Sequence, residues 1–241
     1  MQRYFISNEN FLENIIIGND VFHIYKVMRN KPNDLIEVCC DNKAYLAKIV
    51  EISSEFVKFE VVDEIKQKAQ NKPKITLIQG LAKGDKNEEI IKHGTELGVD
   101  IIYLLQMDRS IVKIESKKVD SKLERYRKIA KEAAEQSHRN TIPEIFIINN
   151  LKEIDFSVYD IKLLLDEEEA KKPDGTLLCD VSVEGHDIIF VVGPEGGISD
   201  NERNKLLLNN FIPVSIGNNI LRTETASLSF LAMLNYIFLK G

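Results

Sequence analysis

Short apolar segments alternate with helical patterns along the last two thirds of the chain. Six of them are rich in isoleucine, leucine and valine: residues 75–80, 101–105, 145–148, 161–165, 188–192 and 213–216. After the first segment, Ile90, Gly94 and Leu97 recur at helical spacing, and Gly98 stands where that helix would end. Near-continuous apolar strands between helices are typical of a parallel sheet covered on both faces. The pattern predicts an α/β domain with a mostly parallel sheet.

The start of the chain carries a different pattern. Three segments, residues 35–40, 44–51 and 56–62, are rich in β-branched and aromatic residues. The turn signals Asp41-Asn42 and Ser53-Ser54 separate them. We therefore expect a small β-rich domain here, distinct from the α/β domain that follows.

One helix and one linker complete this part of the prediction. Residues 20–29 place four apolar side chains on one helical face, those of Val21, Ile24, Val27 and Met28. Residues 63–74 have few apolar side chains and a proline near their end, as linkers do. The sequence thus predicts a β domain over residues 1–70 and an α/β domain over residues 71–241.

Glycines follow two of the predicted strands. The segment 188–192 leads directly into Gly193-Pro194-Glu195-Gly196-Gly197, which we call the glycine loop, and Gly217 follows residues 213–216. A helix-start pattern, Ser199-x-x-Glu202, comes next, and Arg222-Thr223-Glu224-Thr225 opens the last apolar helix. Because carboxyl ends of parallel strands meet at one edge of a sheet, these segments predict a ligand site there.

The residues of the glycine loop do not match either of two common phosphate-binding motifs. A P-loop needs Gly-Lys-Ser/Thr entering a helix, whereas Ile198 and Ser199 follow here. A dinucleotide fingerprint belongs after the first strand of its fold, and Glu195 would repel a pyrophosphate. S-adenosylmethionine, whose purine and cationic centre suit backbone groups and carboxylates, fits better. Simple tight turns at these glycines remain the alternative.

Charge and composition narrow the function classes. A net charge of −6 on 241 residues argues against non-specific nucleic-acid binding over the whole surface. Residues 109–139 hold ten Lys/Arg against five Asp/Glu, and a long helix is predicted within them over residues 119–139. Residues 151–202 hold four Lys/Arg against fourteen Asp/Glu. This asymmetry fits one face that meets a polyanion, or two solvated helices of opposite charge.

Cysteine spacing and the beginning of the chain exclude other classes. Cys39, Cys40 and Cys179 have neither disulfide-framework nor zinc-ligand spacing, so we expect no metal site. The chain starts without a signal-peptide pattern, and no apolar segment approaches the length of a membrane span. We therefore expect a cytoplasmic protein that does not associate with membranes.

Motifs along nearly the whole chain resemble those of the ribosomal RNA small subunit methyltransferase E family, within the knotted SPOUT class. They occupy residues 3–5, 23–29, 83–86, 95–98, 109–113, 135–139, 193–197 and 221–226. The resemblance implies an N-terminal PUA-like β-barrel and a C-terminal domain tied in a trefoil knot. It also implies a homodimer that transfers a methyl group from S-adenosylmethionine to N3 of one uridine in small-subunit (16S) rRNA.

Guided by the resemblance, we assign hypothetical roles to individual residues in the motifs and at the strand ends. The expected cofactor-binding residues are Leu165, Glu167, Gly193, Pro194, Glu195, Gly196, Gly197, Ile216, Gly217, Leu221, Thr223, Thr225 and Ala226. Arg222 is the expected catalytic cation, which stabilises the negative charge left when N3 loses its proton. The expected RNA contacts are Arg3, Lys26, Arg29, Lys83, Arg109 and Arg139.

Alternatives stay open at this stage. Arg222 could instead pair with Glu224 or Glu195 at the helix start, and each expected RNA contact could be a solvated surface charge. Neither His23 nor His138 has a context that marks it as the proton acceptor. A related methyltransferase acting on another RNA position, and a non-catalytic RNA-binding protein that senses the cofactor, are the rival functions.

Overall fold

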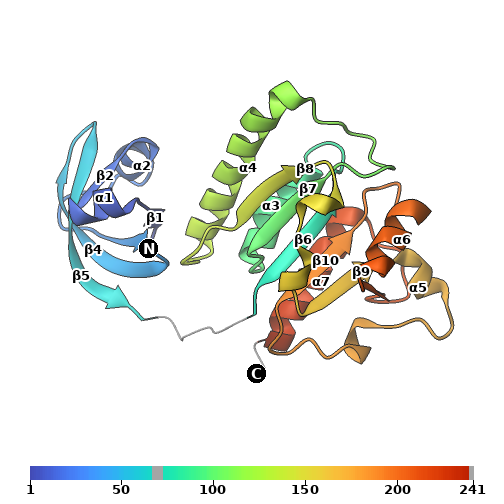
Figure 1. Ribbon diagram of the computed structural model, residues 1–241. Helices are drawn as coiled ribbons and strands as arrows, with labels where there is room; N and C mark the ends of the chain where they lie inside the picture. Colours follow the sequence, from blue (N-terminus) through green and yellow to red (C-terminus); the bar gives the residue numbers. More distant parts are fainter. Residues whose placement is uncertain (67–72, 239–241) are drawn as a thin grey trace. The chain divides into compact units, whose positions relative to one another are not determined.

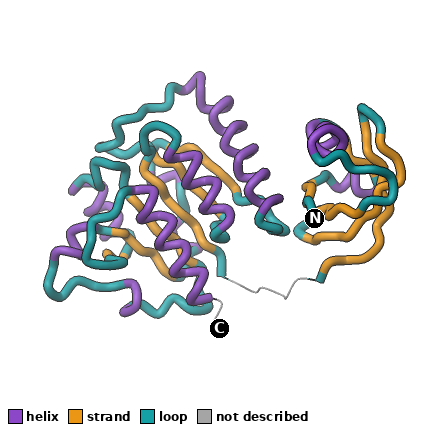
Figure 2. The backbone as a smooth tube through the Cα atoms, turned by 180° about the vertical axis from the view of Figure 1, so that it is seen from behind, coloured by secondary structure: helices purple, strands orange, loops and turns teal. Residues whose placement is uncertain are grey.

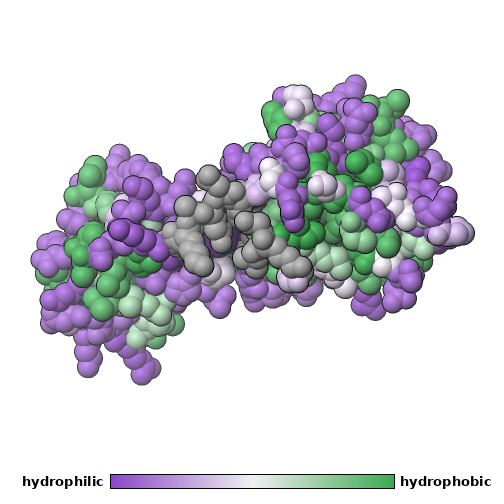
Figure 3. All heavy atoms as spheres, turned by 90° about the horizontal axis from the view of Figure 1, so that it is seen from below, coloured by the Kyte–Doolittle hydropathy of each residue, from purple (hydrophilic) through white to green (hydrophobic). Residues whose placement is uncertain are grey.

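The computed structural model describes residues 1–66 and 73–238 (Figure 1). The chain forms two compact units, the first with residues 1–70 and 134–141, the second with residues 71–133 and 142–241. The predicted boundary between residues 70 and 71 lies outside the described residues. Hydrophobic residues are interspersed with hydrophilic ones on the surface of both units (Figure 3).

The first unit is a five-stranded sheet in the order β1-β3-β4-β5-β2. Its strands are β1 (Arg3–Phe5), β2 (Ile15–Ile17), β3 (Leu35–Cys40), β4 (Lys43–Ile52) and β5 (Phe56–Ile65). β1 runs parallel to β3, and the other pairs are antiparallel. Tyr4, Ile16, Val38 and Phe59 pack together in its core. The three strands predicted over residues 35–62 are confirmed.

Two features of the first unit differ from the prediction. β5 continues to Ile65, so the first residues of the expected linker pair with β4 as strand. The strands β1 and β2 are three residues long, too short for a visible periodicity, and the sequence did not predict them. The helix α1 (Asn8–Leu12) lies between them.

The helix expected over residues 20–29 is not a regular α-helix. It consists of α2 (Asn19–Phe22) followed by a π-helix, η1 (His23–Val27). A π turn is wider than an α turn and shifts the phase of the later side chains. Val21 and Ile24 are buried as expected, but Val27 and Met28 are 55% and 46% exposed.

The second unit is built on six parallel strands in the order β11-β9-β10-β6-β7-β8. They are β6 (Ile75–Gly80), β7 (Ile101–Leu105), β8 (Glu144–Ile148), β9 (Ile161–Leu165), β10 (Ile188–Val192) and β11 (Ile212–Val214). The predicted α/β fold with its parallel sheet is confirmed. The trefoil knot stays a prediction of the resemblance.

Helices cover both faces of this sheet (Figures 1 and 2). They are α3 (Lys86–Glu96), α4 (Ser116–Gln136), α5 (Glu167–Lys171), α6 (Asp200–Leu208) and α7 (Thr223–Phe238), with short 3₁₀ turns at η2 (Leu151–Glu153), η3 (Phe156–Val158) and η4 (Leu178–Asp180). In the described part of the chain, no helix is long and apolar enough to cross a membrane.

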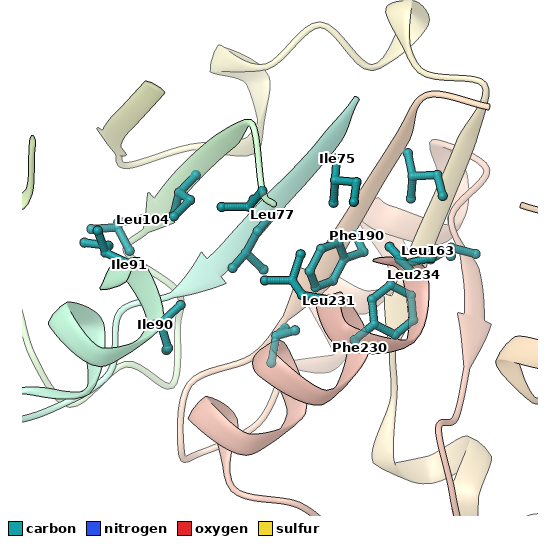
Figure 4. Packing of buried hydrophobic residues seen from close by; sticks show 14 of the residues in the cluster. Ile75, Leu77, Ile90, Ile91, Leu104, Leu163, Phe190, Phe230, Leu231 and Leu234 are labelled. Atoms are coloured by element: carbon teal, nitrogen blue, oxygen red, sulfur yellow. The ribbon is translucent and has the colours of Figure 1, made fainter. Parts of the chain in front are cut away.

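The apolar strands divide their side chains between two cores, as the two-residue period of a strand requires. Phe190 of β10 packs with α3 and α7 on one face (Figure 4), its ring centroid 4.6 Å from that of Phe230. The adjacent Ile189 and Val191 pack on the other face with Leu206 of α6. The buried sheet is thus a rigid base whose carboxyl edge carries the loops described next.

Candidate functional site

A cavity of about 790 Å³ opens at the carboxyl edge of the parallel sheet. Residues after β6, β9, β10 and β11 line it, together with the start of α7. Its volume lies within the range of small-molecule sites, roughly 300–1,000 Å³. Parallel strands bring these segments to one edge although they are far apart in the sequence.

The glycine loop forms one wall of the cavity. It turns back on itself through a hydrogen bond from the Gly197 amide to the Pro194 carbonyl, 2.9 Å long. Gly197 has φ = +73°, which side-chain-bearing residues rarely adopt, and its Cα faces Glu167. The capping box predicted at Ser199 and Glu202 is present and starts α6 immediately after the loop.

The segment after β7 packs against the glycine loop. The backbone of Arg109 approaches Gly196 so closely that a Cβ on Gly196 would lie 2.8 Å from the Arg109 carbonyl oxygen. The Arg109 guanidinium donates from Nη1 to the Gly196 carbonyl at 3.4 Å. Its neighbour Asp108 accepts from Ser199 Oγ at 2.6 Å, and the Asp108 amide donates to Glu202 at 2.9 Å. Arg109 therefore lies at the cavity rim.

Lys86 joins two carboxylates at the back of the site. Its Nζ lies 3.2 Å from Glu195 Oε1 and 3.0 Å from Glu224 Oε2. Burial raises the pKa of Glu195, but hydrogen bonds from its own amide and that of Lys83, with the Lys86 ammonium, lower it overall. Because Lys86 compensates the charge of Glu195, repulsion by Glu195 is a weaker argument against phosphate than the sequence suggested.

Arg222 is placed differently from Lys86. Its side chain is exposed and lines the cavity directly before α7. Glu195 and Glu224, the partners that the alternative gave to Arg222, are bound to Lys86 instead. Within the described residues, no carboxylate lies within ion-pair distance of the Arg222 guanidinium. The alternative of a helix-start ion pair is therefore not realised there, although the nearby charge of Arg222 helps to lower the pKa of Glu224.

Acidic and apolar residues line the opposite side. Asp166 caps α5 and accepts from Arg203 Nε at 2.6 Å, and this hydrogen bond raises the pKa of Arg203. Glu167 points toward Gly197. The aliphatic lining comes mainly from Leu164, Leu165, Val192, Val214, Ile216, Ile220 and Leu221. The walls thus combine apolar surface with carboxylates.

Ten of the expected cofactor-binding residues line this cavity: Leu165, Glu167, Gly193, Pro194, Glu195, Gly197, Ile216, Leu221, Thr223 and Ala226. Gly196 lies behind the wall against Arg109, and Thr225 points to solvent. Gly217 lines a separate cavity of about 710 Å³ beside the end of α7. The Thr223 hydroxyl is bonded to the Gly193 carbonyl at 2.6 Å, so its part in the site is indirect.

The six expected RNA contacts fall into different surroundings. Lys83 and Arg109 line the cavity in the second unit. Lys26 and Arg29 are exposed on and after η1 in the first unit. Arg139, half-buried, donates to Thr141 Oγ1 at 3.3 Å.

Arg3 does not fit a contact with RNA. It is 1% exposed, and its guanidinium is bonded to Glu37 at 2.8 Å, to the His138 carbonyl at 2.7 Å and to Asn140 Oδ1 at 2.6 Å. We call Arg3, Glu37, His138 and Asn140 the Arg3 cluster. A buried arginine with these partners joins segments of the first unit, and its burial keeps it from a phosphate in solution.

Sequence reasoning missed three residues of the site. Gln79 is fully buried in β6, and its amide bonds to the start of α7. Lys86 stood in a motif, but its role as the partner of two carboxylates was not predicted. Arg203 lies inside α6 without any distinguishing pattern. Of these three, only Gln79 gave a signal, as a side-chain amide within a mostly apolar strand.

Known proteins resemble the chain over its length. A family model for an RNA methyltransferase domain matches residues 69–235, and one for an RNA methyltransferase PUA domain matches residues 16–62. The ribosomal RNA small subunit methyltransferase E of Bacillus subtilis (strain 168) is 36% identical over 98% of this chain and 96% of that protein. The protein of that name from Buchnera aphidicola is 30% identical over 98% and 89%.

Solved structures agree with the sequence comparisons. A ribosomal RNA small subunit methyltransferase E from Neisseria gonorrhoeae, bound to S-adenosyl methionine, matches with a TM-score of 0.81 and 29% identity over 98% of each chain. A methyltransferase from Legionella pneumophila in complex with the same cofactor matches with a TM-score of 0.81 and 29% identity, over 92% of this chain and 91% of that one. The chain belongs to the ribosomal RNA small subunit methyltransferase E family.

Proposed function

We propose that this protein transfers a methyl group from S-adenosylmethionine to N3 of a uridine in small-subunit rRNA. The observation that carries the proposal is family membership over almost the whole chain, combined with a cavity at the sheet edge that is lined by the exposed Arg222. Curated relatives are named for small-subunit rRNA methylation, and solved relatives hold the cofactor.

The cavity suits S-adenosylmethionine in size and chemistry. Its aliphatic walls, such as Ile216 and Leu221, provide apolar surface for an adenine ring. The glycine loop brings backbone groups close to the cavity. Glu167 and Asp200 place negative charge on the lining, which favours the cationic sulfonium and ammonium groups of this cofactor. The donor methyl, bound to a positive sulfur, is the chemical contribution of the cofactor.

Arg222 supplies the electrostatic part of the reaction. When N3 of uridine loses its proton, negative charge spreads onto the two neighbouring carbonyl oxygens. N3 then attacks the methyl carbon as the carbon–sulfur bond breaks, and S-adenosylhomocysteine and one proton are the other products. A cation on the cavity wall that is not bound in an ion pair stabilises the developing charge. His23 and His138 belong to the first unit, where their rings contact Tyr4 and Glu37.

The RNA contacts proposed are Lys26, Arg29, Lys83, Arg109 and Arg139. Arg3 is left out because it is buried. If several of these cations neutralise phosphates, RNA affinity falls steeply with added salt. Affinity that stays level between 50 and 200 mM salt would contradict this assignment. The uridine must expose its pairing edge, so it is unpaired or flipped out when it reacts.

A homodimer is part of the proposal. The second cavity, of about 710 Å³, has a mostly apolar lining along the last turns of α7. Met233 and Tyr236 there are 39% and 60% exposed. A partner copy would cover such a surface, and light scattering at several concentrations measures whether it does. Because its substrate belongs to the ribosome, the protein would act in the cytoplasm.

The decisive experiment uses undermethylated small ribosomal subunits and S-adenosylmethionine with a labelled methyl group. The protein should label one uridine, and mass spectrometry of the digested rRNA should place the methyl on N3. Naked rRNA and tRNA run in parallel separate the substrate forms and the rival RNA targets. Cofactor binding without any labelled product would favour the non-catalytic sensor and contradict the proposal.

A further inference from the structure

A hydrogen-bonded chain of polar side chains lies in the core next to the glycine loop. Gln79, Thr223 and Ser227 are 0%, 6% and 0% exposed. Gln79 Nε2 lies 2.8 Å from Thr223 Oγ1, and Ser227 Oγ lies 2.5 Å from Gln79 Oε1. Buried polar groups are costly unless they are bonded, so this chain needs a reason to exist inside an apolar core.

The two carbonyl groups at the ends of this hydrogen-bonded network determine the direction of the bonds between them. Carbonyl oxygens only accept, and the chain ends on those of Gly80 and Gly193. Gln79 Nε2 therefore donates one hydrogen to Gly80, at 2.9 Å, and the other to Thr223. The single hydroxyl hydrogen of Thr223 then points at the Gly193 carbonyl, 2.6 Å away. Gln79 Oε1 accepts from Ser227, whose one hydroxyl hydrogen also has the Thr223 carbonyl within reach, 3.1 Å away.

This arrangement requires glutamine chemistry at position 79. The site uses two N–H donors and one acceptor on a planar group. Glutamate of the same shape lacks both donors, and leucine lacks all three groups. Either substitution leaves the Thr223 hydroxyl free to turn away from Gly193.

The hydrogen-bonded network connects the two cavity walls that the proposed reaction uses, the glycine loop and the start of α7. Gly193 is the first residue of the glycine loop, and Thr223 directly follows Arg222. Beside Gln79, Gly80 also supports the loop, because a Cβ on Gly80 would lie 2.4 Å from Pro194 Cδ. The end of β6 thus contacts both the loop and the start of α7.

We propose that Gln79 is a positioning residue for methyl transfer. Through the Thr223 hydroxyl it holds the glycine loop and Arg222 in fixed relation, so that cofactor and catalytic cation face one another. Gln79 itself is fully buried and acts only through its neighbours. This inference rests on the proposed function, since it assigns Gln79 to the same site.

The test is a double-mutant cycle on the full-length chain. Gln79→Leu, Thr223→Val and the double variant are titrated with S-adenosylmethionine by calorimetry, and their melting temperatures are recorded. Each single variant should raise the Kd about tenfold, the effect of a buried group left unpaired. The Kd of the double variant should not exceed that of the single variant with the higher Kd, because both substitutions interrupt the same hydrogen-bonded network.

Two controls separate positioning from stability. Thr76→Val lies on the same strand and removes a buried hydroxyl that has no hydrogen-bond partner, so its Kd should stay within about twofold of wild type. Leu104→Ala opens a cavity in the core of β7 and lowers the melting temperature, with the same unchanged Kd. If Gln79→Leu does not fold, Ser227→Ala, which deletes one hydroxyl, takes its place with a rise of about threefold.

The outcomes are distinct. A Gln79→Leu protein that melts early but binds the cofactor like wild type would overturn the inference and leave the proposed function standing. Additive losses in the double variant would show that Gln79 does not act through Thr223. A wild-type chain that binds no S-adenosylmethionine would overturn the proposed function itself.

Discussion

An arginine has opposite surroundings in the Arg3 cluster and at the cavity edge. Arg3 and Arg222 both stand in motifs of one family, and sequence reasoning gave both of them functional roles. Arg3 is buried and surrounded by Glu37, the His138 carbonyl and Asn140. Arg222 is exposed on the cavity, while nearby carboxylates are bound to Lys86.

The difference teaches how a cation is made structural or reactive. A guanidinium that is bonded to partners on several chain segments holds those segments together. A lysine that neutralises the neighbouring carboxylates leaves an arginine beside it free to respond to charge that develops later. Changes at the cavity edge should therefore cost function with little stability, and changes in the Arg3 cluster the reverse.

The largest effect is expected at Gly197. Gly197→Val places a β-branched residue at φ = +73° and should abolish cofactor binding, because the loop must leave this conformation. Gly185→Val is the matched control: Gly185 has φ = +76°, open space around it and no place in the cavity lining. Calorimetry should show binding by the control and none by Gly197→Val, while circular dichroism shows both folded. Equal binding by the two variants would remove the glycine loop from the site.

Arg222→Ala should have the next largest effect. Loss of a cation that stabilises the transition state lowers the rate of methyl transfer by about a hundredfold or more. The Kd for S-adenosylmethionine should stay within about threefold, since this charge acts on the uridine. Single-turnover measurements with undermethylated subunits give the rate. A near-normal rate would make Arg222 resemble Arg3, a residue with no part in the chemistry.

Arg3→Ala should reverse this pattern. Removing Arg3 takes the guanidinium out of a buried ion pair and leaves Glu37 bonded to the His138 ring, which costs about 3 kcal/mol of unfolding free energy. Lys58→Ala breaks a pair with Glu51 in which both side chains are 52% exposed, and should cost less than about 1 kcal/mol. Urea denaturation, monitored by hydrogen exchange in the first unit, measures the loss of unfolding free energy in both variants. Unchanged stability together with weaker RNA binding would return Arg3 to the RNA-binding set.

Sequence patterns were sufficient for the buried sheet and for the place of the site. Residues 75–80, 101–105, 161–165 and 188–192 form strands with the predicted bounds, because a strand buried on both faces is mostly apolar. The capping box at Ser199 was equally readable, since its two hydrogen bonds join residues three apart.

The partners of polar side chains were beyond the sequence. Arg3 meets His138 across 135 positions, and Gln79 meets Thr223 across 144. Nothing local marks such a pair, so burial of Arg3 and the neutralisation of Glu195 by Lys86 went unpredicted. The π-helix η1 was missed for a related reason: its apolar residues suit an α-helix, and only the fold decides which of them are covered.

The smallest effect expected is a pH dependence of the Arg3 cluster. Burial raises the pKa of Glu37, but hydrogen bonds from His138 and Arg3 outweigh it, and the pKa lies below its usual 4.5. A carboxylate with a lowered folded pKa contributes stability that is present above pH 4.5 and is lost as the pH falls through the folded value.

Glu37→Gln isolates this contribution. The variant should be less stable than wild type at pH 6, and the difference should shrink as the pH falls below 4.5, because the wild-type carboxylate then takes up a proton. Urea denaturation at half-unit steps from pH 6 to pH 3 measures the two curves, and methyl transfer at neutral pH should change little per folded molecule. A constant difference across that range would mean that Glu37 stabilises the first unit by packing alone, and the cluster would then differ from the cavity edge in burial but not in its use of charge.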